Sequence, residues 1–512
     1  MIATKTIMKA LPMLASILGR KYGVKVEISG KKAYTDGNVI HLPALPLKSN
    51  ETLLGLVRGF IDHESAHVRE TDFDVLKDKS LSPLAKNIWN IFEDWRVENA
   101  ISKTFPGCRA NFDWLIDYEF VKKNQVSQNA ASQILNYILL HVREWDVKSV
   151  SKNRDIIGKE VGNNFPNLFS KLNALLGQVR SDCKSSSDCM EYARKVVKIL
   201  EEEAIEIASS DLNSQNMKNL KGLLNAQESE LPGGLGQIIG GELEGSAPKT
   251  VKGLSVASVE KKQLDPLSKN ESETAKRAST ALRTRLESLL QSSVLTRRAP
   301  SRFGKLDTNR LYKLNYSPKI FLKNEEKPGL NTAIHILLDS SSSMLEKMNL
   351  AGQATYAIAD SLYKTKGITI AVSAFPAGTP VRPGDPYWQY PTISHVLKYG
   401  QKMHHNFKLS AYGGTPLGEA LWKVMQEAYF LKEKRKIILI ITDGKPDSIQ
   451  NTESAIELGK ELGFEFYGIG IEDDNIRSFL PETSRVIRKI DELAPAMFGL
   501  LQNALLNLKR KV

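Results

Sequence analysis

The feature that most constrains the fold is a largely apolar run at residues 334–338 that ends in Asp339 and four serines. A helical pattern follows, so the run predicts a buried parallel strand that carries polar side chains to the carboxyl edge of an α/β sheet. Asp339, Ser341 and Ser343 have the spacing Asp-x-Ser-x-Ser. Oxygen ligands on a tight turn favour a hard divalent cation such as Mg²⁺.

Two later segments add oxygen ligands to this set. Thr415 follows two glycines and precedes a helical pattern, and a second apolar run, 436–441, leads to Asp443. Strand and helix patterns alternate through residues 331–512, which predicts an α/β doubly wound parallel sheet with its site at the strand ends. The competing interpretation is that the serines cap a helix and the acids end strands. The sequence carries all three oxygen-bearing segments in this order, which favours the metal site over helix capping.

These five residues together resemble the metal-ion-dependent adhesion site of the von Willebrand factor A domain, a Rossmann-like fold. The resemblance implies that Asp339, Ser341, Ser343 and Thr415 contact Mg²⁺ directly or through water, and that Asp443 acts through water. It also implies one coordination position open to a carboxylate of a partner protein.

A second motif lies near the amino terminus. Residues 24–43 predict β structure with a hairpin, and a helical pattern over residues 51–70 carries the sequence HExxH. On a helix, His63 and His67 share one face and bind one Zn²⁺, while Glu64 is placed to polarise a zinc-bound water. Glu64 is therefore the candidate catalytic residue.

The third zinc ligand is expected on the next helical pattern, which carries an E-x-x-R-x-E stretch at residues 93–98. Thermolysin-like zincins use a glutamate on a following helix, and this similarity favours Glu93, with Arg96 and Glu98 supporting the site. Asp94 is the alternative. Strands, an HExxH helix and an acidic helix in this order resemble a minimal α+β zincin-like domain. The competing interpretation is a surface helix with salt-bridged side chains.

Length and pattern divide the 512 residues into several parts. We expect a zincin-like domain at 1–120, a helical region at 121–225 and a flexible Gly- and Ser-containing linker at 226–275. A helix and lead-in at 276–330 precede the A domain at 331–512.

Composition restricts the partners and the compartment. The net charge of +12 is spread along the chain, and no basic and aromatic ladder occurs, so nucleic acid is not an expected partner. No apolar run has the length of a membrane span. Three cysteines without CxxC spacing are typical of a reducing compartment. We therefore expect a cytoplasmic protein that does not bind membranes.

Several segments, among them residues 301–306, 338–344, 417–421 and 467–471, resemble the carboxyl-terminal domain of the cobaltochelatase CobT subunit. Residues 93–98 resemble a stretch in its amino-terminal part. The complete HExxH and the Gly-Gly-Thr-Pro loop favour a CobT-like relative. The resemblance implies a non-ATPase subunit that works with a MoxR/CobS-type AAA+ ATPase and a third substrate or chelatase subunit, in a complex related to cobalamin synthesis or protein remodelling.

The chain has no Walker A motif, which agrees with an accessory role. The alternative function is an enzyme. A zinc metallopeptidase would use His63, Glu64 and His67, and its A domain would recruit the substrate.

Overall fold

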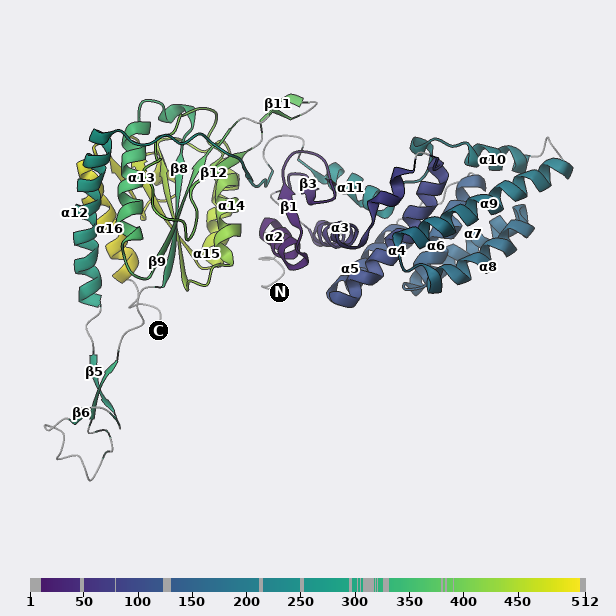
Figure 1. Cartoon of the computed structure of the whole chain (residues 1–512), viewed down its shortest axis with the longest axis horizontal. Coiled ribbons are helices and arrows are strands. Elements are labelled where there is room, and N and C mark those ends of the chain that lie inside the picture. Colours follow the sequence, from purple (N-terminus) through teal and green to yellow (C-terminus); the bar gives the residue numbers. More distant parts are fainter. Residues whose placement is uncertain are drawn as a thin grey trace. The chain divides into compact units, whose positions relative to one another are not determined.

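The computed structural model divides the chain into two compact units, Met1–Gly253 and Leu254–Val512 (Figure 1). The structure describes the following residues: 11–46, 50–78, 80–122, 130–210, 215–248, 253–293, 297–301, 303, 305–306, 317, 319, 321–325, 331–378, 381–382, 385–389 and 391–506. Much of the expected lead-in to the A domain, including residues 307–316, lies outside these ranges.

Unit 1 begins with a small sheet that packs beside helices. Helix α2 (Leu11–Tyr22) precedes strands β1 (Lys25–Ile28), β2 (Tyr34–Thr35) and β3 (Val39–Leu42). The strand order is β1-β3-β2, with β2 and β3 antiparallel across the expected hairpin. The sheet is followed by the two helices that carry the predicted zinc ligands.

Both of these helices have clear starting signals. Asn50 caps α3 (Glu51–Glu70), and its side chain accepts a 2.8 Å hydrogen bond from the backbone of Leu53. Ser82 caps α4 (Pro83–Thr104), which has proline at its first position. The two helices pack against each other and against α5 (Gly107–Asp117).

The rest of unit 1 is mainly helical. Its apolar side chains form one core with α4, to which α8 contributes Leu168, Leu172 and Leu176 at four-residue spacing. The helices of this part are α6 (Ala130–Glu144), α7 (Ser151–Asn164), α8 (Pro166–Asp182), α9 (Ser186–Ser210) and α10 (Gln215–Leu224).

The segment expected to be a flexible linker is largely ordered, and this corrects the prediction for residues 226–275. It contains α11 (Leu235–Ser246), which packs on α3, and the beginning of α12 (Lys269–Ser293). Leu235, Ile239 and Leu243 are buried at four-residue spacing. Because several glycines lie around these three residues, the short apolar face of this helix is hard to recognise in the sequence.

Unit 2 contains a mostly parallel seven-stranded sheet in the order β15-β14-β13-β8-β9-β12-β4. Within this sheet, β12 and β9 pair in antiparallel fashion, and the other pairings among its described strands are parallel. The doubly wound, mainly parallel sheet predicted for residues 331–512 is confirmed. The strands are β4 (Ser258–Val259), β8 (Thr332–Asp339), β9 (Ile368–Phe375), β12 (Thr392–Leu397), β13 (Arg435–Thr442), β14 (Phe464–Ile471) and β15 (Ser484–Ile487).

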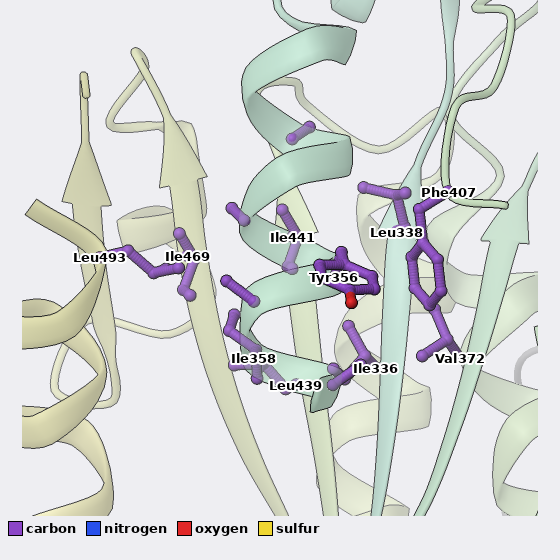
Figure 2. Packing of buried hydrophobic residues seen from close by; sticks show 14 of the residues in the cluster. Ile336, Leu338, Tyr356, Ile358, Val372, Phe407, Leu439, Ile441, Ile469 and Leu493 are labelled. Carbon is purple, nitrogen blue, oxygen red and sulfur yellow. The ribbon is translucent and has the colours of Figure 1, made fainter. Parts of the chain in front are cut away.

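Helices cover both faces of this sheet. In Figure 1, α12, α13 (Met348–Tyr363) and α16 (Leu493–Leu506) lie on one side, and α14 (Leu417–Tyr429) and α15 (Ile449–Glu461) lie on the other. Tyr356 of α13 points toward Ile336, Leu338 and Val372 of the central strands in Figure 2. All eight residues of β8 are buried, so its end is held firmly at the carboxyl edge of the sheet. Among the described residues, no helix has the length and apolar character needed to cross a membrane.

Candidate metal centres

The first candidate centre lies where β8 and β13 end. Asp339 is fully buried, and its Oδ1 accepts a 2.8 Å hydrogen bond from the backbone of Ser341. Its Oδ2 accepts a 2.5 Å hydrogen bond from the Thr442 hydroxyl on the neighbouring strand. Burial raises the pKa of Asp339 to about 6, and the nearby Asp443 carboxylate adds to this effect. These two carboxylates at one edge make the site favourable for a cation.

The structure brings all five predicted oxygen ligands of this centre together. The Ser343 hydroxyl donates to Asp443 Oδ1 at 2.7 Å and lies 3.0 Å from the Ser341 hydroxyl. A β-carbon on Gly444 would lie 3.4 Å from Ser343 Oγ and 3.6 Å from Thr415 Oγ1, so both hydroxyls face this glycine. The donors are all carboxylate or hydroxyl oxygens, which fits a hard divalent cation.

Two lysines flank this centre, and sequence reasoning missed both. The Lys347 ammonium lies 2.7 Å from Asp443 Oδ2. Lys262 is only 8% exposed, and its ammonium donates to Ser340 Oγ at 2.7 Å and to the Pro376 carbonyl at 2.9 Å. No local pattern marks Lys262, because it comes from the segment expected to be a linker.

The second candidate centre joins α3 and α4 in unit 1. Nε2 of His67 lies 3.1 Å from Asp94 Oδ1, and Nε2 of His63 lies 4.0 Å from the same oxygen. One ligand atom from each of these three buried residues lies within 4.8 Å of the others. Ligands about 2.0–2.1 Å from a tetrahedral zinc are roughly 3.3 Å apart. The spacing and the N/O donor set therefore fit Zn²⁺.

The outer nitrogens of both histidines are held by other side chains. Nδ1 of His63 lies 2.9 Å from Glu98 Oε1, and Nδ1 of His67 lies 3.0 Å from Thr71 Oγ1. The buried Arg143 in turn donates to Glu98 at 2.5 Å and to Asp94 at 3.4 Å. Carboxylate-to-histidine contacts of this kind orient the opposite ring nitrogen toward a metal.

Electrostatics at this centre also favour a cation. Burial alone would lower the pKa of His63, but the Asp94 and Glu98 carboxylates outweigh it and raise the pKa to about 9. Burial would raise the pKa of Asp94, yet His63, His67 and Arg143 lower it to about 2. The carboxylates are therefore ionised beside rings that offer nitrogen ligands when deprotonated.

Glu93, the expected third ligand, does not join the histidines, and this corrects the prediction. Its Oε1 accepts hydrogen bonds from Arg96 at 2.5 Å and from the Ser186 hydroxyl of α9 at 2.7 Å. Successive residues of a helix are rotated by about 100°, so Glu93 faces α9 while Asp94 faces α3. Arg96 accordingly pairs with Glu93, whereas Glu98 supports His63 as expected.

Glu64 lies beside this cluster but is only 8% exposed. Burial raises the pKa of its carboxyl group. Its carboxyl group is therefore in surroundings that are largely closed to solvent.

Family models match two parts of the chain. Residues 333–488 match the family model of the von Willebrand factor type A domain, the class of domain that the sheet and the five-residue loop cluster define. Residues 3–218 match the model described as "Cobalamin biosynthesis protein CobT". The chain thus resembles CobT over residues 3–218 and carries a von Willebrand factor A domain in its carboxyl-terminal part. A search of curated proteins finds no match.

Solved structures resemble about one third of the chain. Proximal thread matrix protein 1 from the mussel byssus is 20% identical over 34% of this chain and 46% of its own, with a TM-score of 0.27. The manganese-loaded Plasmodium vivax TRAP protein is 14% identical over 34% of this chain and 72% of its own, also with a TM-score of 0.27. The ArnB paralog VWA2 from Sulfolobus acidocaldarius is 15% identical over 34% and 46%, with a TM-score of 0.23. The chain spans about half the length of the first of these.

Proposed function

We propose that this CobT-like chain is a non-ATPase subunit of a chelatase-type complex that binds a partner protein through a divalent cation, Mg²⁺, on its A domain. The observation that carries the proposal is the gathering of five oxygen-bearing side chains from three loops at one sheet edge. A cation held by such a set keeps positions for water or for a partner's carboxylate. The Mg²⁺ ligands are Asp339, Ser341, Ser343, Thr415 and Asp443.

The proposed partner is a MoxR/CobS-type AAA+ ATPase, with a third substrate or chelatase subunit as the component acted on. The CobT family match supports this arrangement, and so does the lack of a Walker A motif in the sequence. The three cysteines are free and buried, which suits a reducing compartment, so we place the complex in the cytoplasm.

Titration calorimetry with Mg²⁺ tests the metal site. Asp339→Ala removes a buried ligand and is expected to abolish binding, whereas Ser342→Ala changes an exposed serine of the same loop and is expected to leave it intact. Mg²⁺ binding that survives in Asp339→Ala would overturn the assignment of the site.

Pull-down of the AAA+ partner tests docking separately. Wild type and Ser342→Ala should capture the ATPase in Mg²⁺ and lose it in EDTA. If Asp339→Ala loses Mg²⁺ but still captures the ATPase, docking through the metal is wrong even though the metal site is right.

A second function is favoured by the histidine cluster of unit 1. His63, His67 and Asp94 would hold Zn²⁺, which would supply a polarised water for peptide hydrolysis with Glu64 as the base. Comparing Glu64→Gln with wild type on candidate proteins, with and without a chelator, tests this alternative. Cleavage that persists in the variant would exclude it.

A further inference from the structure

Helix α11 lies directly against the HExxH centre. A β-carbon on Gly236 would lie 2.6 Å from Glu64 Oε1 and 3.1 Å from His63 Nε2. Both distances are too short for a real side chain, so the backbone of α11 reaches these two residues only because position 236 is glycine. The helix thus lies on the side of the centre where Glu64 and the inner nitrogen of His63 meet.

The start of α11 is attached on the same side by several contacts. The Leu235 backbone nitrogen lies 3.4 Å from Asp94 Oδ2, and its side chain is buried. A β-carbon on Gly234 would lie 1.9 Å from Asn90 Nδ2, and Asn87 donates a 2.7 Å hydrogen bond to the Pro232 carbonyl. The Gly-Gly-Leu-Gly stretch is therefore fitted closely onto α4 as well as α3.

The remainder of α11 is also held in place. Ile239 and Leu243 are buried, and Glu244 accepts a 3.0 Å hydrogen bond from the backbone of Ala33. Burial of these two aliphatic side chains stabilises the packing of the helix on unit 1. The helix is a packed part of unit 1 in this conformation.

We propose that α11 is the closing wall of the metal centre, and that it occupies the space a peptide needs to reach the metal beside Glu64. This inference rests on the proposed zinc site, and it adds whether the metal is open to substrate or enclosed. A catalytic zinc keeps an open position for water and substrate, whereas a structural zinc is enclosed. His63, His67 and Asp94 leave one position of a tetrahedral zinc open, and α11 covers that position, so we expect the centre to retain its metal tightly.

Two glycines of the same helix give a matched test. Gly236→Ala places a methyl group against Glu64, whereas Gly241→Ala places one where no atom lies within 4 Å. Both changes replace a glycine of the same helix with alanine and favour the helical backbone to a similar extent, so they differ mainly in contact with the centre. The measurement is zinc content by mass spectrometry, followed by the rate of zinc transfer to a colorimetric chelator.

We expect Gly236→Ala to release zinc at least tenfold faster than wild type, and Gly241→Ala to match wild type. Equal rates in all three proteins would overturn the closing role while leaving the zinc site intact. Wild type that binds no zinc would overturn the zinc proposal and this inference with it.

A second variant, remote from the metal, keeps the proposal testable if Gly236→Ala does not fold. Ile239→Ala leaves a cavity under α11 without touching the ligands, and circular dichroism shows whether the fold persists. Faster zinc release in folded Ile239→Ala supports the wall, and an unchanged rate in this variant overturns it.

Discussion

The ammonium of Lys262 donates a 2.7 Å hydrogen bond to the hydroxyl of Ser340, 78 residues further along the chain. Ser340 lies between Asp339 and Ser341, two of the proposed Mg²⁺ ligands. The ammonium also lies 4.2 Å from the centre of the Tyr412 ring, and Tyr412 precedes the loop that carries Thr415. One buried lysine therefore contacts two of the loops that form the centre.

Replacing Lys262 tests its contribution to stability. Lys262→Met leaves the Pro376 carbonyl and the Ser340 hydroxyl without this donor, and we expect a loss of about 1–3 kcal/mol in the free energy of unfolding. The exposed neighbour gives the control, since Lys261→Met should change stability by less than about 0.5 kcal/mol. Urea denaturation of both variants measures the difference, and equal midpoints would contradict the prediction.

The third zinc ligand can be identified by two neighbouring substitutions. Asp94→Asn should reduce zinc content strongly, because it removes the carboxylate beside both histidines. Glu93→Gln disrupts a buried pair with Arg96 and should lower stability while zinc content stays near one per chain. Mass spectrometry of the folded proteins gives the answer. Zinc loss in Glu93→Gln alone would restore Glu93 as the ligand.

We propose that Glu98 orients His63 and does not itself bind the metal. Glu98→Gln weakens the contact to Nδ1, so we expect zinc affinity to fall by roughly 10–100-fold without loss of the site. Competition with a chelator of known affinity measures the change. An affinity equal to that of wild type would contradict an orienting role for this carboxylate.

Unit 2 should become less stable in mild acid because of His335. The pKa of His335 is lowered from 6.5 to about 4. Burial is the main cause, the Glu427 carboxylate acts in the opposite direction, and His395 adds to the lowering. In the unfolded chain, the His335 imidazole is therefore protonated as the pH falls through about 6.5. In the folded chain, it is protonated only as the pH falls through about 4. Stability from this group is complete above pH 6.5 and falls by up to about 3 kcal/mol as the pH drops toward 4.

Urea midpoints at pH 7 and pH 5 measure this effect. His335 contacts Ser373 at 2.9 Å and Tyr399 at 3.2 Å, so His335→Gln lowers stability at both pH values. The stability that His335→Gln loses between pH 7 and pH 5 should nevertheless be smaller than the stability that wild type loses. The exposed His405→Gln serves as the control and should keep the wild-type loss. A loss in His335→Gln as large as in wild type would refute the assignment.

The part of the site that lies at strand ends was predictable from the sequence. Asp339 and Asp443 each follow an apolar run directly, and parallel strands end at one edge, so local pattern determines where both carboxylates lie. The helical ligands were only partly predictable. Residues 93 and 94 are both acidic, and only the packing of α4 between α3 and α9 decides which one faces the histidines.

Contacts distant in sequence explain the remaining differences. Lys262 and Gly236 lie in a segment whose glycines and serines indicate a linker, and neither belongs to a motif. Their roles depend on which side chain lies opposite, namely Ser340 for Lys262 and Glu64 for Gly236. A single sequence contains no information on such pairings until the fold is known.

The boundary of unit 2 has a practical consequence for anyone isolating the A domain. The family match begins at residue 333, yet β4 pairs with β12, and Leu267, Ala275 and Leu282 belong to the unit 2 core. A fragment cut at residue 333 would expose the edge of β12 and the apolar surface under α12, both of which promote aggregation. A fragment that starts at Leu254 retains the strand, the helix and Lys262, and is the one we expect to remain in solution.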